Sequence, residues 1–176
     1  WSKYTAYFSE YQILTIDLPN TGDSDVMEAS VARMAKVVNA VLTAEGLEKC
    51  ILIGHSMGGK TAMYTASIAP QLIEKLIIVD IGPKYYPPHH QAILKGLKAV
   101  EKAKVQSRKE ADRVLSAHFD QLSIRQFLLK NLYWKTKTCL EFRFNLDAIS
   151  EQIEEVGKIL PSSFNYTAPS LFIRGE

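Results

Sequence analysis

A serine stands between two glycines in the segment Gly54-His55-Ser56-Met57-Gly58, which matches the pattern G-x-S-x-G. A serine hydroxyl held at a sharp strand-to-helix turn can attack a carbonyl carbon when a histidine takes its proton. Glycines are expected at the −2 and +2 positions because side chains there would collide with neighbouring elements. The pattern predicts Ser56 as the nucleophile, with the Met57 backbone N–H stabilising the oxyanion at the start of the following helix.

The same segment also satisfies the phosphate-binding pattern G-x-x-x-x-G-K-[ST], from Gly54 through Lys60 to Thr61. A phosphate-binding loop lies between a strand and a helix as well, so the local context does not separate the two interpretations. A third interpretation is a glycine-rich turn that only joins a strand to a helix. The motif alone leaves all three open.

The elements around the motif alternate between strand and helix. Apolar, β-branched runs predict buried strands at 12–17, 50–54 and 76–80. Apolar residues at helical spacing predict an amphipathic helix over about 27–45, ended by Gly46. Small residues predict a closely packed helix over 57–69, ended by Pro70. This alternation is typical of an α/β fold with a mostly parallel sheet and crossover helices.

Helical periodicity and charge dominate from about 91 to 160, with one possible strand at 140–144, and strand character returns at 169–175. We therefore expect a sheet that is interrupted by a helical insertion and then resumed. The expected division is core over 1–81, a helical cap over 82–166, and resumed core over 167–176.

Composition limits the classes of partner. The 176 residues are 47% hydrophobic with a net charge of +2, which predicts one globular core and gives no reason to expect nucleic acid. No apolar run reaches the roughly 18 residues that a membrane-spanning helix needs. Cys50 and Cys139 form no C-x-x-C pair, which favours a reducing compartment. We expect a cytoplasmic protein, or one of the mitochondrial matrix if the source is eukaryotic.

Beyond the motif, the chain resembles a known family. GHSMGGKTAM, a strand ending in IVDIGP, and the helical stretches IRQFLLKNL and FRFNLDAI resemble small intracellular YbfF-type esterases of the α/β-hydrolase superfamily and their mitochondrial relatives. The resemblance extends over nearly all 176 residues, including the insertion. It therefore favours the α/β-hydrolase fold over the phosphate-binding loop.

The resemblance also implies a role for Asp80. Most α/β hydrolases carry the triad acid after the strand that follows the insertion, but Glu176 lies too close to that strand. The enzymes that this chain resembles place the acid before the insertion, where Asp80 stands. Ligand-facing groups of an open α/β sheet converge at the carboxyl ends of its strands, which agrees with that role. The alternative is an aspartate that caps the loop at Gly82-Pro83.

The family places the catalytic histidine after the last strand, and the chain has no histidine there. None of the four histidines is expected to be the base, namely His55, His89, His90 and His118. The upstream His-Gly loop of the family, which supplies a second oxyanion donor, is also missing. We therefore expect the chain to lack both ends of the fold. Asn20-Thr21-Gly22 replaces the usual Asn-His-Gly, which puts the packing of that loop in doubt.

The activity implied is hydrolysis of a small acyl ester or thioester through an acyl-enzyme, without metal or organic cofactor. The alternatives are a catalytically silent binding protein, and a C–C hydrolase or peptidase on the same fold. A haloalkane dehalogenase is disfavoured because its nucleophile is an aspartate. Most apolar residues of the insertion are expected in its core, and some are candidates to line an acyl pocket: Phe119, Leu122, Phe127, Leu128, Leu129, Leu132, Tyr133 and Trp134.

Overall fold

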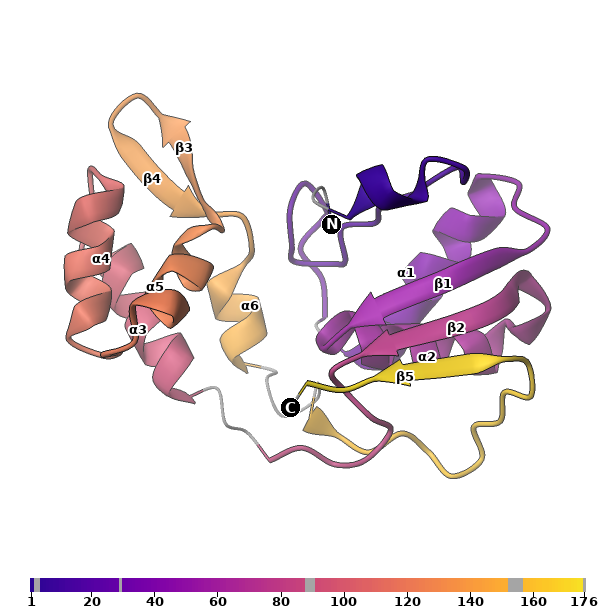
Figure 1. The fold of residues 1–176 in the computed structure, drawn as a ribbon. Helices are drawn as coiled ribbons and strands as arrows, with labels where there is room; N and C mark the ends of the chain where they lie inside the picture. The colour runs from indigo at the N-terminus through magenta and orange to yellow at the C-terminus, as the bar shows by residue number, and fades with distance from the viewer. Residues whose placement is uncertain (2–3, 29, 88–90, 152–156, 176) are drawn as a thin grey trace.

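The computed structural model describes all residues except 2–3, 29, 88–90, 152–156 and 176 (Figure 1). A parallel sheet has the strand order β1-β2-β5, formed by β1 (Cys50–His55), β2 (Ile73–Val79) and β5 (Ser170–Ile173). The register pairs His55 with Val79 and Val79 with Ile173, so the three strands end side by side. The strands expected at 50–54, 76–80 and 169–175 are thus confirmed as elements.

Two helices, α1 (Val31–Ala44) and α2 (Met57–Ile68), cover one face of this sheet (Figure 1). The buried residues between them and the sheet are Val38, Leu42, Ala62, Met63, Ala66, Ile73, Leu76 and Ile78. The small side chains of α2 allow its backbone to approach the strands closely. Ile51 and Ile53 of β1 point to the other face of the sheet and are exposed among the described residues. The expectation that this strand is buried is therefore wrong for that face of the sheet.

Helix α1 begins later than its apolar periodicity predicts. Ser30 caps it, since the serine hydroxyl accepts a hydrogen bond from the Arg33 N–H at 3.2 Å. Met27 lies outside the helix because the Asn20 side chain holds its backbone N–H at 3.0 Å and its carbonyl at 2.7 Å. Gly46 ends α1 with φ +68°, as expected.

The strand expected at 12–17 is wrong, since the structure shows no strand there. A strand forms only when its backbone is paired with a neighbour, and no described residue pairs with this stretch. Ile13 and Leu14 are accordingly exposed. A 3-10 turn, η1 (Thr5–Phe8), precedes the stretch, and a second, η2 (Pro70–Leu72), follows α2.

The chain between β2 and β5, here called the inserted segment, has a core of its own. It contains α3 (Gln91–Lys102), α4 (Arg108–Ser116), α5 (Leu122–Leu129), β3 (Leu132–Thr136), β4 (Cys139–Phe142) and α6 (Leu146–Glu151). Strand β4 was expected near 140–144, whereas its antiparallel partner β3 was not. The Arg108 guanidinium donates to the carbonyls of Leu129 and Leu132 and so fixes α4 against the start of the hairpin.

The loop after residue 18 joins the sheet layer to the inserted segment. Thr21 and Phe144 form an isolated β-bridge, the Gly22 N–H donates to the Arg143 carbonyl at 2.5 Å, and the Asn145 N–H donates to the Asn20 carbonyl at 2.7 Å. The Thr21 hydroxyl donates back to the Leu18 carbonyl at 2.6 Å. The Asn-Thr-Gly sequence therefore packs as an ordered junction.

The core of the inserted segment can be tested with two leucines. Leu115→Ala removes a side chain that is fully buried, whereas Leu122→Ala removes one that is 53% exposed. In the full-length protein we expect Leu115→Ala to lower the free energy of unfolding by about 2–5 kcal/mol, and Leu122→Ala to change it by less than about 0.5–1 kcal/mol. Urea unfolding measures both. Equal losses would show that this core is not packed as described.

Candidate active site

Ser56 lies in the turn between β1 and α2 with φ +52° and ψ −122°. A residue with a side chain rarely adopts this backbone, which costs on the order of 1–3 kcal/mol and persists only where neighbours impose it. The Ser56 N–H donates to the Val79 carbonyl at 3.0 Å, and its carbonyl accepts from the Gly59 and Lys60 N–H groups at 2.8 and 3.1 Å. The side chain is exposed.

The glycines around Ser56 differ in how much space each would leave for a side chain. A Cβ atom at Gly54 would stand 2.2 Å from the carbonyl oxygen of Gly58, so the close approach expected at −2 is confirmed. A Cβ atom at Gly58 would meet nothing within 4 Å, so the collision expected at +2 is wrong. The tight position is Gly59, where a Cβ atom would stand 2.4 Å from Ile81 Cγ2.

Met57 is the first residue of α2. The N–H group of the first helical residue has no acceptor within the helix and lies at the positive end of the helix dipole. The first turn of α2 contains no acidic residue that would offset this partial charge. An oxygen that gains negative charge above Ser56 would therefore be stabilised there.

Asp80 follows β2 as Ser56 follows β1. Since the register pairs His55 with Val79, the two side chains leave neighbouring strands at one edge. Asp80 also has a positive φ, +56°, its N–H donates to the Ile173 carbonyl at 2.7 Å, and its side chain is exposed. The alternative loop-capping role has little support, because the Gly82 N–H donates to the Tyr86 hydroxyl at 2.8 Å.

The histidines do not complete a triad among the described residues. His55 is exposed on β1, and His118 lies in the turn after α4 with its ring 6.4 Å from the Phe119 ring. Neither ring is hydrogen-bonded to a described carboxylate. His89, His90 and Glu176 lie outside the described residues.

Lys60 is fully buried, and its ammonium group is already occupied. It donates to the carbonyls of Lys84 at 2.9 Å, Gly157 at 3.2 Å and Lys158, and lies 5.3 Å from the centre of the Tyr86 ring. Burial lowers the pKa of this lysine. The lysine of a phosphate-binding loop must reach a phosphate, so these contacts argue against that interpretation. The sequence shows Lys60 as the one charged residue of α2, but it does not indicate the partners of that charge.

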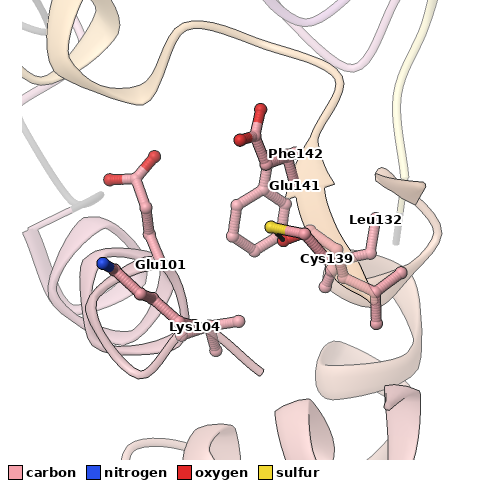
Figure 2. Close-up of a pocket in the computed structure, with 8 residues that line it drawn as sticks. Glu101, Lys104, Leu132, Cys139, Glu141 and Phe142 are labelled. Carbon is pink, nitrogen blue, oxygen red and sulfur yellow. Dashed lines mark hydrogen bonds between the residues drawn. The ribbon is translucent and has the colours of Figure 1, made fainter. Parts of the chain in front are cut away.

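A cavity of about 470 Å³ lies in the inserted segment between α3 and the β3–β4 hairpin (Figure 2). The charged side chains at its wall are Glu101, Lys104 and Glu141. Partial burial, and then the nearby Asp147 carboxylate, raise the pKa of Glu101. Every residue that lines the cavity belongs to the inserted segment, so its wall does not include the turn at Ser56.

The candidate acyl-pocket residues differ in their burial, and Tyr133 is half-buried. Leu128, Leu129 and Leu132 are buried in the core of the inserted segment, and Phe119 packs against it. Of the eight candidates only Leu132 lines the cavity of Figure 2. Three others are largely exposed, namely Leu122, Phe127 and Trp134.

Within the described residues no group of three His, Cys, Asp or Glu side chains is arranged to hold a metal ion. No helix in the same part of the chain is both long and apolar enough to cross a bilayer.

Comparison with known proteins agrees with this geometry. Residues 2–127 match the family described as the alpha/beta hydrolase fold. The chain belongs to the α/β-hydrolase family. The α/β-hydrolase fold expected from the sequence is thereby confirmed, and the turn at Ser56 follows β1 at the carboxyl edge of the parallel sheet.

Three relatives of this α/β hydrolase are named as esterases or lipases. The mouse protein "sn-1-specific diacylglycerol lipase ABHD11" is 39% identical over 93% of this chain and 55% of its own length. A "Putative esterase/lipase" of Haemophilus influenzae is 38% identical over 97% and 58%, and "Esterase YbfF" of Escherichia coli is 31% identical over 95% and 64%. The chain thus spans little more than half the length of the first two. The resemblance to YbfF-type esterases is confirmed.

Among solved structures, a "Marine microorganism esterase" superposes with a TM-score of 0.92. The two sequences are 32% identical, and the alignment covers 100% of this chain and 71% of the esterase.

The turn at Ser56 makes a paired prediction about its glycines. Gly54→Ala places a methyl group against the backbone of Gly58 and is expected to cost at least about 1–3 kcal/mol of unfolding free energy. Gly58→Ala adds the same methyl group in open space and is expected to be neutral or stabilising by about 0.4–1 kcal/mol. Thermal unfolding of both full-length variants measures the difference. A Gly58→Ala variant as unstable as Gly54→Ala would contradict the described turn.

Proposed function

We propose that this α/β hydrolase cleaves carboxylic esters or thioesters, with Ser56 as the nucleophile. The observation that carries the proposal is the backbone of Ser56, which is held at φ +52° by hydrogen bonds to β2 and α2 and leaves the hydroxyl exposed at the carboxyl edge of the sheet. The esterase and lipase names of relatives at 31–39% identity support the same reaction class.

In the proposed mechanism the Ser56 Oγ bonds to the substrate carbonyl carbon while a histidine takes the hydroxyl proton. The carbonyl oxygen becomes an oxyanion that accepts a hydrogen bond from the Met57 N–H and is stabilised by the α2 dipole. The ester or thioester bond then breaks, and the alcohol or thiol leaves with the histidine proton. Water attacks the acyl-enzyme by the same route, releases the acid and restores Ser56.

Asp80 is the proposed triad acid. Its position one strand away from Ser56, at the same edge of the sheet, would allow it to orient the histidine and stabilise its protonated form. We assign neither the histidine nor the second oxyanion donor to a described residue, because neither the His55 ring nor the His118 ring is hydrogen-bonded to a described carboxylate.

We further propose that residues 82–166 act as a cap over Ser56 on a core formed by 1–81 and 167–176. Strands β1 and β2 end on the side of the inserted segment (Figure 1), and the Asn20–Gly22 loop is bonded to it through Arg143 and Asn145. A cap in this position would contact the acyl chain of a small ester or thioester substrate.

Replacement of the nucleophile tests the proposal. In the full-length protein, Ser56→Ala is expected to lower kcat/KM for p-nitrophenyl esters by at least about 10³-fold, because no acyl-enzyme can form. Ser116→Ala removes an exposed hydroxyl from α4 and serves as the matched control with unchanged turnover. Circular dichroism should show that both variants are folded. Retained ester hydrolysis in folded Ser56→Ala would refute the assignment.

Asp80 is tested by an isosteric change. Asp80→Asn is expected to lower kcat by on the order of 10²–10⁴-fold, because a neutral amide cannot stabilise the protonated histidine. Asp120→Asn makes the same change at an exposed position of the inserted segment and should leave kcat unchanged. Steady-state kinetics on a short ester measure both variants. If Asp80→Asn turns over like the wild type, the triad acid lies elsewhere in the protein.

A further inference from the structure

Lys60 carries a buried charge that the proposed chemistry does not use. An ammonium group has three N–H donors and no acceptor, and a charge removed from water is tolerated only when those donors are satisfied. Three backbone carbonyls accept from it, those of Lys84, Gly157 and Lys158. The face of the Tyr86 ring, 5.3 Å away, adds a cation–π contact. Lys60 is thus satisfied without a carboxylate.

The three carbonyls belong to the two stretches of the inserted segment that connect its helices and hairpin to the sheet. Residues 83–86 leave the sheet shortly after Asp80, and residues 157–160 return towards β5. These two stretches, here called the hinge pair, are bonded to each other: the Tyr86 N–H donates to the Gly157 carbonyl at 2.8 Å, and the Leu160 N–H donates to the Pro83 carbonyl at 2.9 Å. Lys60 therefore binds both members of the hinge pair at once.

Lys60 is also tied to the turn that carries the nucleophile. It lies in the first turn of α2, and its own N–H donates to the Ser56 carbonyl at 3.1 Å. The preceding residue, Gly59, packs against Ile81, between Asp80 and the hinge pair. Lys60 thus contacts Ser56 through its backbone N–H and the inserted segment through its ammonium group.

We infer that Lys60 is a positioning residue that fixes the inserted segment relative to Ser56 and thereby determines which acyl-chain lengths the site accepts. The inference rests on the proposed function, since it needs Ser56 to act on acyl esters beneath the inserted segment. Lys60 does not touch the substrate, because its ammonium group is buried among the hinge carbonyls. It acts through the hinge pair.

The test compares esters of different length in the full-length protein. Lys60→Met keeps most of the side-chain stem and removes the ammonium group that donates to the three hinge carbonyls. We expect the ratio of kcat/KM for p-nitrophenyl octanoate to that for the acetate to fall by about tenfold or more, the effect of losing burial for a few methylene groups. The fall should appear in the KM for octanoate, with kcat for acetate close to the wild-type value. Lys36→Met, the same change at an exposed site on α1, should leave the ratio unchanged.

Hydrogen exchange measures the stability of the hinge pair independently of enzymatic activity. Amide exchange in peptides that cover 83–86 and 157–160 is expected to become faster in Lys60→Met and to stay unchanged in Lys36→Met. Gly157→Ala provides a second route that leaves Lys60 intact, since its Cβ atom would stand 2.4 Å from the Tyr86 carbonyl oxygen and force the hinge pair apart. It should shift both the ester ratio and the exchange in the same direction, and it decides the question if Lys60→Met does not fold.

The outcomes separate the inference from the proposed function. An unchanged ester ratio in the folded variants overturns the inference, as does a uniform loss of activity on all esters, which a purely structural lysine would give. A wild-type protein that hydrolyses no ester overturns the proposed function and the specificity role together. In that case faster exchange in Lys60→Met and Gly157→Ala still supports the contact between Lys60 and the hinge pair. Unchanged exchange in both variants overturns that contact too.

Discussion

The Ser56 N–H donates to the Val79 carbonyl at 3.0 Å and so extends the parallel pairing of β1 with β2 one residue beyond the end of β1. The chain must then turn into α2 at once, which requires the positive φ of Ser56 and the absence of a side chain at Gly54. Asp80 repeats the arrangement on β2, with a positive φ and a hydrogen bond to Ile173. The neighbouring positions of the two proposed catalytic side chains follow from this strand register.

Close packing of the neighbouring residues offsets the energetic cost of the strained Ser56 backbone. Gly59 lies against Ile81, and Lys60 is anchored by three carbonyls, so the first turn of α2 is held on both sides. The inserted segment is attached to the sheet layer at this hinge pair and at the Asn20–Gly22 loop. Two separate attachments would keep the proposed cap in a defined place over Ser56, which specificity for an acyl chain requires.

Elements with a strong local signal were predictable from the sequence. The run before Gly54, the small residues of α2 and the β-branched run of β2 gave the strand–turn–helix–strand unit and the position of Ser56 within it. Features that depend on partners far away in the sequence were not predictable. The 12–17 stretch has the composition of a strand but no paired neighbour among the described residues. Strand β3 was missed because helical periodicity and charge dominate the sequence around it. The carbonyl partners of Lys60 at 157 and 158 are 97 and 98 positions away, so no local pattern indicates them.

The most direct test of the central claim is labelling of the full-length protein with a fluorophosphonate probe, followed by mapping of the modified peptide. The probe reacts with a serine whose hydroxyl is activated by a base and whose oxyanion is stabilised. The account predicts stoichiometric modification of Ser56, and loss of labelling when an ester substrate competes. Modification of a different residue, or none in a folded protein, would contradict it and favour a binding protein on the same fold.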